Sequence, residues 1–238
     1  NSEIDPRNKD VKVFINGEFF LREDAKISVF DSGYLIGDGV WEGMRLHNDV
    51  IVFIDLHLNR LWHSAKAIGM NLPFTKEVLV NDIHKTLNEN DMHENIHLRV
   101  MVTRGIKKTP TQDPRFTISG PNVVIIAEHK KASIESKEQG VTLFTSAIRR
   151  GSPDSLDPRL NCHSKLHEVQ ALIQAIEAGA DEALMLDIKG FAISMPFKIE
   201  VLNYVDELSK EVKYIGAANT IINDNGYLKA YNTDWVGA

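Results

Sequence analysis

Alternating apolar and polar residues mark the first predicted element. The stretch "VKVFINGEFF" (11–20) surrounds Asn16-Gly17, a pair that is typical of two-residue β-hairpin turns. Apolar residues then recur every three or four positions, which predicts helices over 56–70 and 75–91. Thr75 is in position to cap the second helix. The residues predicted to point inward from that helix are Val78, Ile83 and Leu87.

Strand-like runs follow over 96–105, 122–130 and 141–150. A helix is predicted over 165–180, ending near Gly179, and a further strand over 181–190. This order of elements, without an internal repeat, predicts an α+β fold class.

The pattern restarts after Gly190. "FAISM" (191–195) predicts a short strand, and a helical pattern runs from Pro196 to residue 216. "ANTIINDNGYLKAYNTD" (218–234) predicts a second hairpin. The segment "DIKGFAISMPFKIE" (187–200) is therefore predicted to be a junction between two different parts of the chain.

Composition narrows the class of protein. The 238 residues suit one large or two small domains, and the formal net charge of −6 argues against a nucleic-acid surface. The single cysteine, Cys162, fits a reducing, cytoplasmic location, and no apolar run is long enough for a membrane span. The chain begins with Asn1 rather than Met, so we expect it to be a fragment.

Some residue groups suggest chemistry. "HENIH" (93–97) has the H-E-x-x-H spacing of a zinc site, but it leads into a strand, which favours a polar loop. Cys162 is expected to be a small packing residue. Arg60, Arg99 and Arg104 are either surface cations or members of ion pairs or, taken together, an anion pocket. Lys165 is either a solvated side chain or a nucleophilic amine.

Residues 12 to about 191 resemble a class IV, fold-type-IV aminotransferase. The landmarks that carry the resemblance, in order, are "FDSGYLIGDGVWEGMR", "FIDLHLNRLWHSAKAIGM", "HLRVMVTRG", "NCHSKLHEVQALIQAIEAGADEALMLD" and "KGF". The resemblance implies pyridoxal 5'-phosphate as cofactor and an amino acid or 2-oxo acid as substrate. It also implies that Arg60 holds the cofactor phosphate, that Trp41 faces the active site, and that Arg99 and Arg104 help to place the substrate carboxylate.

The sequence departs from that family at its centre. Asn161 stands at the position of the Schiff-base lysine, and Lys165, about one helical turn later, is the nearest substitute. Ile193 stands where the family has the glutamate that pairs with the pyridine nitrogen. The family's phosphate-gripping Gly-[Ile/Val]-Thr segment is missing. We therefore expect an incomplete site.

Residues 191–238 resemble part of the substrate domain of shikimate dehydrogenases. "AISMPFK" (192–198), "IGAANT" (215–220) and "YNTDWVGA" (231–238) carry this resemblance. It implies that Lys198 is catalytic, that Asn219 binds a substrate hydroxyl and that Asp234 pairs with the lysine. No dinucleotide fingerprint is present in the sequence.

We therefore expect three parts: an aminotransferase-like small domain (1–130), the start of a truncated large domain (131–190), and a short α/β dehydrogenase-like segment (191–238). The predicted function is pyridoxal-phosphate-dependent amino transfer by a homodimer. The alternatives are a non-catalytic dimerising module and the remnant of an NADP-dependent shikimate dehydrogenase. If residues 192–238 leave the truncated domain uncovered, an exposed apolar patch is expected around "EALMLD" (182–187).

Overall fold

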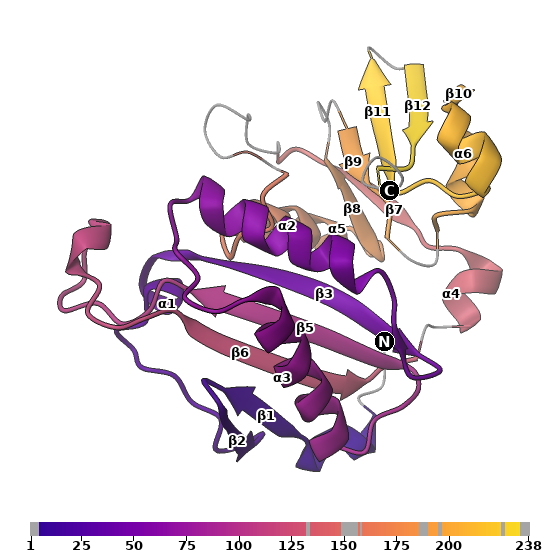
Figure 1. Cartoon of the computed structure of the whole chain (residues 1–238). Coiled ribbons are helices and arrows are strands. Elements are labelled where there is room, and N and C mark those ends of the chain that lie inside the picture. The colour runs from indigo at the N-terminus through magenta and orange to yellow at the C-terminus, as the bar shows by residue number, and fades with distance from the viewer. Residues whose placement is uncertain are drawn as a thin grey trace. The chain divides into compact units, whose positions relative to one another are not determined.

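The computed structural model describes residues 5–131, 134–148, 157, 159–185, 190–194, 197–224 and 227–233 (Figure 1). The chain divides into two compact units. Unit 1 comprises Asn1–Lys131 and Leu156–Lys165, and unit 2 comprises Ala132–Ser155 and Leu166–Ala238. The chain therefore leaves unit 1, enters unit 2 and returns before its last crossing.

Unit 1 is built on a six-stranded antiparallel sheet with strand order β2-β1-β6-β5-β3-β4. The strands are β1 (Lys12–Ile15), β2 (Glu18–Leu21), β3 (Gly39–His47), β4 (Val50–Ile51), β5 (Ile96–Thr103) and β6 (Asn122–His129). Asn16 and Gly17 both have positive φ, 52° and 101°, so the predicted hairpin over 11–20 is confirmed. The described part of the unit also contains three short helices: η1 (Pro6–Asp10), α1 (Ser32–Ile36) and η2 (Pro114–Phe116).

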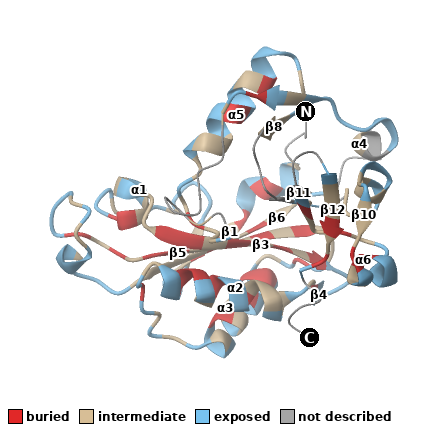
Figure 2. Cartoon of the chain, turned by 90° about the horizontal axis from the view of Figure 1, so that it is seen from above, coloured by how far each residue is buried: buried red, intermediate tan, exposed pale blue. Residues whose placement is uncertain are grey.

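Two helices, α2 (Ile54–Ala67) and α3 (Lys76–Glu89), cover one face of this sheet (Figure 2). Their apolar residues form one core with the inward residues of β3, β5 and β6. The Thr75 hydroxyl accepts a hydrogen bond from the Val78 amide at 3.4 Å, so the predicted cap is confirmed. Ile83 and Leu87 are buried as predicted. The inward prediction for Val78 is wrong: it is 48% exposed, and Leu79 is buried beside it.

The segment 161–163 lies along the edge of β3. Cys162 forms an antiparallel bridge with Val40, the Asn161 carbonyl accepts from the Trp41 amide at 2.9 Å, and the His163 amide donates to the Gly39 carbonyl at 3.0 Å. Cys162 is buried in this arrangement, as expected of a packing residue. A segment about 120 residues away in sequence thus closes part of the sheet edge.

The first part of unit 2 is a small β-α-β arrangement. It contains α4 (Ile134–Gln139), β7 (Leu143–Ser146), α5 (Leu166–Glu177) and β8 (Glu182–Met185), with β7 and β8 parallel. Ala171 and Ala175 of α5 are fully buried, and Gly179 has the positive φ (73°) of a helix-terminating glycine. The outer side of the same helix exposes large apolar residues: Leu166, Val169, Leu172, Ile173 and Ile176.

This exposed stripe lies on α5 rather than at the predicted place. Within 182–187, the described apolar residues Ala183, Leu184 and Met185 are partly buried. In the part of the chain that the structure describes, no helix is long and apolar enough to cross a membrane.

The strands of 190–231 form a separate sheet with order β10-β12-β11-β9. Its elements are β9 (Gly190–Ala192), η3 (Glu200–Tyr204), β10 (Glu207–Leu208), α6 (Lys210–Ile215), β11 (Thr220–Asp224) and β12 (Tyr227–Tyr231). The hairpin strands are confirmed, although their turn at 225–226 lies outside the described residues. A small core of its own contains Val212, Ala218, Ile221 and Ala230.

The continuous helix predicted over 196–216 is wrong. Glu207 and Leu208 instead pair in parallel with Lys229 and Ala230 of β12. Ser209 then caps a new, short helix, because its hydroxyl accepts from the Val212 amide at 3.4 Å. Pro196, the predicted helix start, lies outside the described residues.

Candidate functional site

In unit 1, two cationic side chains, Arg99 and Lys165, lie over the ring of Trp41, and we call these three residues the Trp41 cluster. Residues at alternate positions of a strand share a face, so Trp41 lies on the same side as Gly43, whose β5 partner is Arg99. This side is opposite the helices. The Arg99 guanidinium carbon is 4.1 Å from the centroid of the indole ring, and the Lys165 Nζ is 5.9 Å from it. The indole Nε1 donates to the Cys162 carbonyl at 3.0 Å, which fixes the ring. Three predicted site residues from separate segments are therefore brought together.

The surroundings of this cluster are partly buried and rich in positive charge. Burial lowers the pKa of Arg99, with Glu128 opposing the change. Burial, together with the charges of Lys130, Arg99 and Arg45, lowers the pKa of the neighbouring His97 to about 4. Partly desolvated cations gain most from an anionic ligand. This face of the sheet therefore favours a carboxylate or a phosphate.

Arg60 lies on the helix-covered side and is held by a buried carboxylate. Glu42 follows Trp41 on β3, so it points to the opposite face, where its side chain is 0% exposed. Its two oxygens accept from Arg60 Nε at 2.7 Å and Nη2 at 2.6 Å, and one also contacts His57 Nδ1 at 2.8 Å. The Arg60 side chain is 50% exposed. An oriented, half-exposed guanidinium suits a phosphate ligand.

Glu42 and His57 are absent from the residues predicted for the site. A detectable signal was present: His57 and Arg60 are three residues apart, and therefore on one side of α2. Glu42 is the one acidic residue within the otherwise apolar inner positions of β3.

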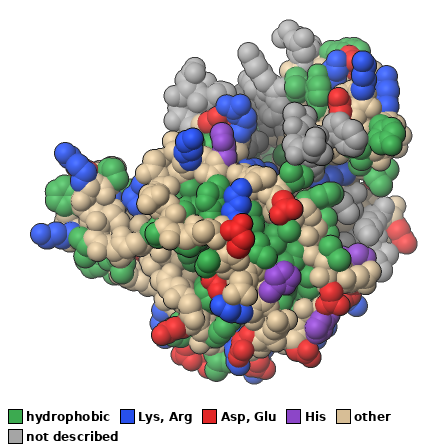
Figure 3. Space-filling view, viewed as in Figure 1, with side chains coloured by type: hydrophobic (Ala, Val, Ile, Leu, Met, Phe, Trp, Pro, Cys, Tyr) green, Lys and Arg blue, Asp and Glu red, His purple; other side chains and the backbone are tan. Residues whose placement is uncertain are grey.

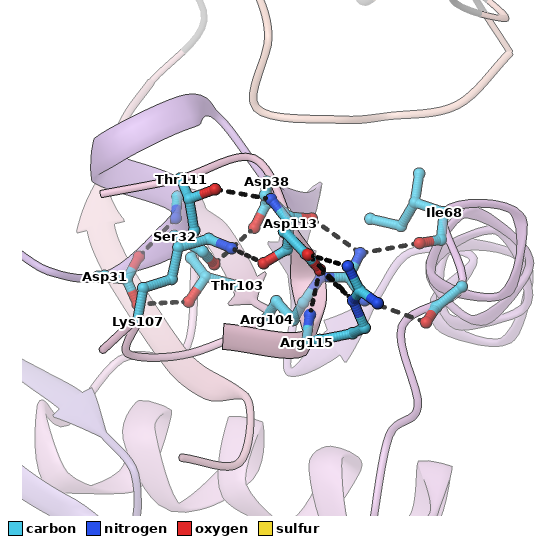
Figure 4. A network of polar contacts seen from close by, with 12 residues as sticks. Asp31, Ser32, Asp38, Ile68, Thr103, Arg104, Lys107, Thr111, Asp113 and Arg115 are labelled. Atoms are coloured by element: carbon cyan, nitrogen blue, oxygen red, sulfur yellow. Dashed lines mark hydrogen bonds and ion pairs between the residues drawn. The ribbon is translucent and has the colours of Figure 1, made fainter. Parts of the chain in front are cut away.

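Arg104 is separate from the Trp41 cluster. Its guanidinium donates to Asp38 through Nε at 2.6 Å and Nη2 at 3.0 Å, and to the carbonyls of Ile68 at 2.8 Å and Gly69 at 3.0 Å (Figure 4). These bonds join the end of β5, the start of β3 and the end of α2. The role of Arg104 in placing the substrate carboxylate stays a prediction. Its contacts with Asp38, Ile68 and Gly69 are structural, and we call them the staple.

The segment 161–165 connects the two faces of β3. The backbone amide of Asn161 donates to Ser64 Oγ at 3.4 Å. Ser64 lies one helical turn after Arg60 on α2. Four residues later, Lys165 reaches the indole on the other face. Arg60 and Lys165 therefore contact adjacent residues of β3, Glu42 and Trp41, on opposite faces of the sheet.

The dehydrogenase-like candidates belong to unit 2. The Asn219 side chain donates to Thr233 Oγ1 at 3.0 Å and accepts from the Thr233 amide at 2.9 Å. The Lys198 carbonyl accepts from the Ala218 amide at 2.7 Å. Asp234 lies outside the described residues, so its pairing with Lys198 stays a prediction.

The "HENIH" stretch spans a turn and the start of β5, as the loop interpretation predicts. His93 is 2.7 Å from Asp49 and 3.1 Å from Asp91, while Glu94 contacts His47 at 2.7 Å. Among the described residues, no three His, Cys, Asp or Glu side chains are grouped so as to hold a metal ion. On the face shown in Figure 3, the described Lys and Arg side chains are interspersed with Asp and Glu.

Comparison with known proteins identifies the family. The model of the family "Amino-transferase class IV" matches residues 39–196. A putative branched-chain-amino-acid aminotransferase of Methanocaldococcus jannaschii is 38% identical over 183 residues, which are 77% of this chain and 62% of that protein. Branched-chain-amino-acid aminotransferase-like protein 2 of Arabidopsis thaliana is 37% identical over 78% of this chain and 33% of its own length.

A solved structure supports the same fold. The branched-chain aminotransferase of the thermophilic archaeon Thermoproteus uzoniensis, solved with norvaline, superposes with a TM-score of 0.66 at 20% identity. The superposition covers 92% of this chain and 86% of that one. The chain spans between a third and two thirds of the length of the two curated relatives above. On the extent of the family match, this chain belongs to the class IV aminotransferases.

Proposed function

We propose that this chain transfers an amino group between an amino acid and a 2-oxo acid, with pyridoxal 5'-phosphate as the carrier. The observation that carries the proposal is the shared indole of Trp41, which Arg99 and Lys165 approach to 4.1 and 5.9 Å. A primary amine, a carboxylate-binding guanidinium and an aromatic wall are the groups that such a reaction needs from the protein.

Arg60 is the proposed phosphate ligand. Its half-exposed guanidinium is oriented by Glu42, and charge-assisted bonds from arginine to phosphate are among the stronger polar contacts in proteins. The residues present thus fit the charge of the cofactor at this end.

Lys165 is the proposed attachment and proton-transfer group. Asn161 has a side-chain amide, which cannot form the covalent link, and its backbone is engaged with Trp41 and Ser64. The Lys165 amine lies over the indole face instead, where it can receive and return the proton of the substrate Cα. Arg99 would bind the substrate carboxylate. When bound, pyridoxal phosphate supplies the ring that accepts the electrons released at Cα.

Ile193 stands where the family has its ring-nitrogen carboxylate, and an isoleucine side chain has no acceptor for that nitrogen. We therefore propose weak cofactor binding and slow turnover.

The test is cofactor loading followed by chemical fixation. The chain of residues 1–238 is incubated with pyridoxal phosphate, reduced with borohydride, digested and mapped by mass spectrometry. We expect a pyridoxyl group on Lys165, and its loss in Lys165→Ala. An Asn161→Lys change in that background should restore labelling at residue 161. Single-turnover assays with individual L- and D-amino acids then identify the donor. Absence of labelling in the wild-type chain would refute the proposal.

A second candidate function is a non-catalytic dimerising module. The observation in its favour is the apolar stripe of α5, where Leu166 is 78% and Ile176 is 63% exposed, since exposed stripes of this kind mark interaction surfaces. We propose a cytoplasmic homodimer in either case. A cooperative thermal transition in a chain that binds no pyridoxal phosphate would favour the module over the enzyme.

We further propose that residues 191–238 derive from a shikimate-dehydrogenase-like protein joined to a truncated aminotransferase domain. The separate sheet and separate small core of this segment support that view. We expect no NADP-dependent oxidation of shikimate. Sequencing of the source DNA through codons 185–197 tests the junction, and an interrupted reading frame there would refute it.

A further inference from the structure

Glu42 has no assigned role in the proposed amino transfer, yet it is the most completely buried acidic group near Arg60. Its side chain is 0% exposed, whereas the Arg60 side chain that it binds is 50% exposed. A buried carboxylate is costly unless its oxygens are paired. Here both oxygens accept from Arg60, and one also contacts His57.

The two partners differ in freedom. Glu42 lies in the middle of β3. Its backbone is fixed because this part of β3 pairs with β5. Arg60 is a long side chain on the surface of α2, and such side chains lose much rotamer entropy when a ligand orders them. The two-point contact at 2.7 and 2.6 Å fixes the plane of the guanidinium. The entropy cost of ordering the Arg60 side chain is therefore incurred when the chain folds, and not when the ligand binds.

We infer that Glu42 is a positioning residue that presets Arg60 for the phosphate of the cofactor. This inference rests on the proposed function, because it concerns the same phosphate contact. Glu42 does not touch the ligand in this scheme. It acts on affinity for the phosphate alone, and not on the ring or on the amine.

That restriction makes the test specific. Pyridoxal 5'-phosphate and pyridoxal share the ring and the aldehyde but differ in the phosphate. The ratio of their dissociation constants for the chain of residues 1–238 therefore isolates the phosphate contact. A variant that only loosened the fold would weaken both ligands alike, so the ratio would not move.

We expect Glu42→Gln to weaken pyridoxal phosphate binding by about tenfold, with pyridoxal binding unchanged. Gln keeps the size of the side chain and one acceptor but loses the second acceptor and the charge. In an Arg60→Met background, which removes the guanidinium, Glu42→Gln should have no further effect on the ratio. Glu89→Gln, which removes the surface ion pair with Lys12, is the matched control and should leave both constants as in the wild type.

The outcomes separate the two ideas. If the wild-type chain binds both ligands equally, Arg60 holds no phosphate, and both the proposed phosphate site and this inference fail. If the wild type prefers pyridoxal phosphate and Glu42→Gln keeps that preference, only the positioning role fails. Should Glu42→Gln be too unstable to assay, Glu42→Asp, which keeps the charge but shortens the reach, is expected to give an intermediate ratio; a wild-type ratio there would overturn the inference.

Discussion

His97 should make the stability of unit 1 depend on pH. The side chain lies on β5 opposite Arg45, and its pKa is lowered from the ordinary 6.5 to about 4 by burial and by the charges of Lys130, Arg99 and Arg45. The unfolded chain takes up this proton near pH 6.5, but the folded chain takes it up only near pH 4. The unfolded state therefore binds more protons between these values, and acidification destabilises the fold.

The size of the effect follows from the pKa difference. The full difference corresponds to about 3.4 kcal/mol. Because His97 is only partly buried, solvent screening reduces this to roughly half. The resulting loss in the free energy of unfolding between about pH 7 and pH 4.5 is ~1 kcal/mol.

The assay is urea unfolding followed by tryptophan fluorescence, since two of the three tryptophans, Trp41 and Trp62, lie in unit 1. Wild type should lose about 1 kcal/mol more than His97→Gln between about pH 7 and pH 4.5. His93→Gln is the control with the opposite sign, because Asp49 and Asp91 raise the pKa of His93; the stability that His93 contributes is present at low pH and lost as pH rises. Parallel pH profiles for wild type and His97→Gln would refute the reasoning.

Other substitutions test the core, the staple and the exposed helix. Ile83→Ala should cost about 3 kcal/mol in urea unfolding, because Ile83 is 0% exposed, whereas Val78→Ala should cost under about 0.5 kcal/mol; equal losses would contradict the observed helix register. Asp38→Asn should lower stability by roughly 2 kcal/mol, since the Arg104 charge it pairs with is only 15% exposed, and an unchanged midpoint would show that the staple contributes nothing. Ile173→Glu on α5 should reduce self-association in sedimentation experiments, and an unchanged sedimentation profile would exclude the stripe as a contact surface.

Local features of this chain were predictable from sequence. Asn16-Gly17 specifies its hairpin because both positions need positive φ, and Thr75 specifies a helix start through its own hydroxyl. The side of α3 that faces the core was harder to predict. Val78 and Leu79 are adjacent, and the choice between them depends on where the sheet lies, which the helix pattern does not contain.

Non-local features explain the remaining failures. The helical pattern of 196–216 is interrupted at Glu207 because β12, about twenty residues later, offers a strand to pair with. In the same way, the residue types of the candidate site were identifiable, but their grouping was not. The spacing of His57 and Arg60 and the acidic inner position of Glu42 are visible in the sequence. That Glu42 holds Arg60 is not, because the sheet register and the packing of α2 bring the two together.

The pairing of 161–163 with β3 can form only late in synthesis, after β3 has already been made. Residues 5–131 leave the ribosome before the segment that closes the β3 edge at 39–41 has been made. During that interval the nascent chain presents open backbone donors and acceptors, which other chains can pair with. A pause in translation just before Asn161 should therefore lower the yield of folded protein. Faster synthesis of residues 161–163 should raise it.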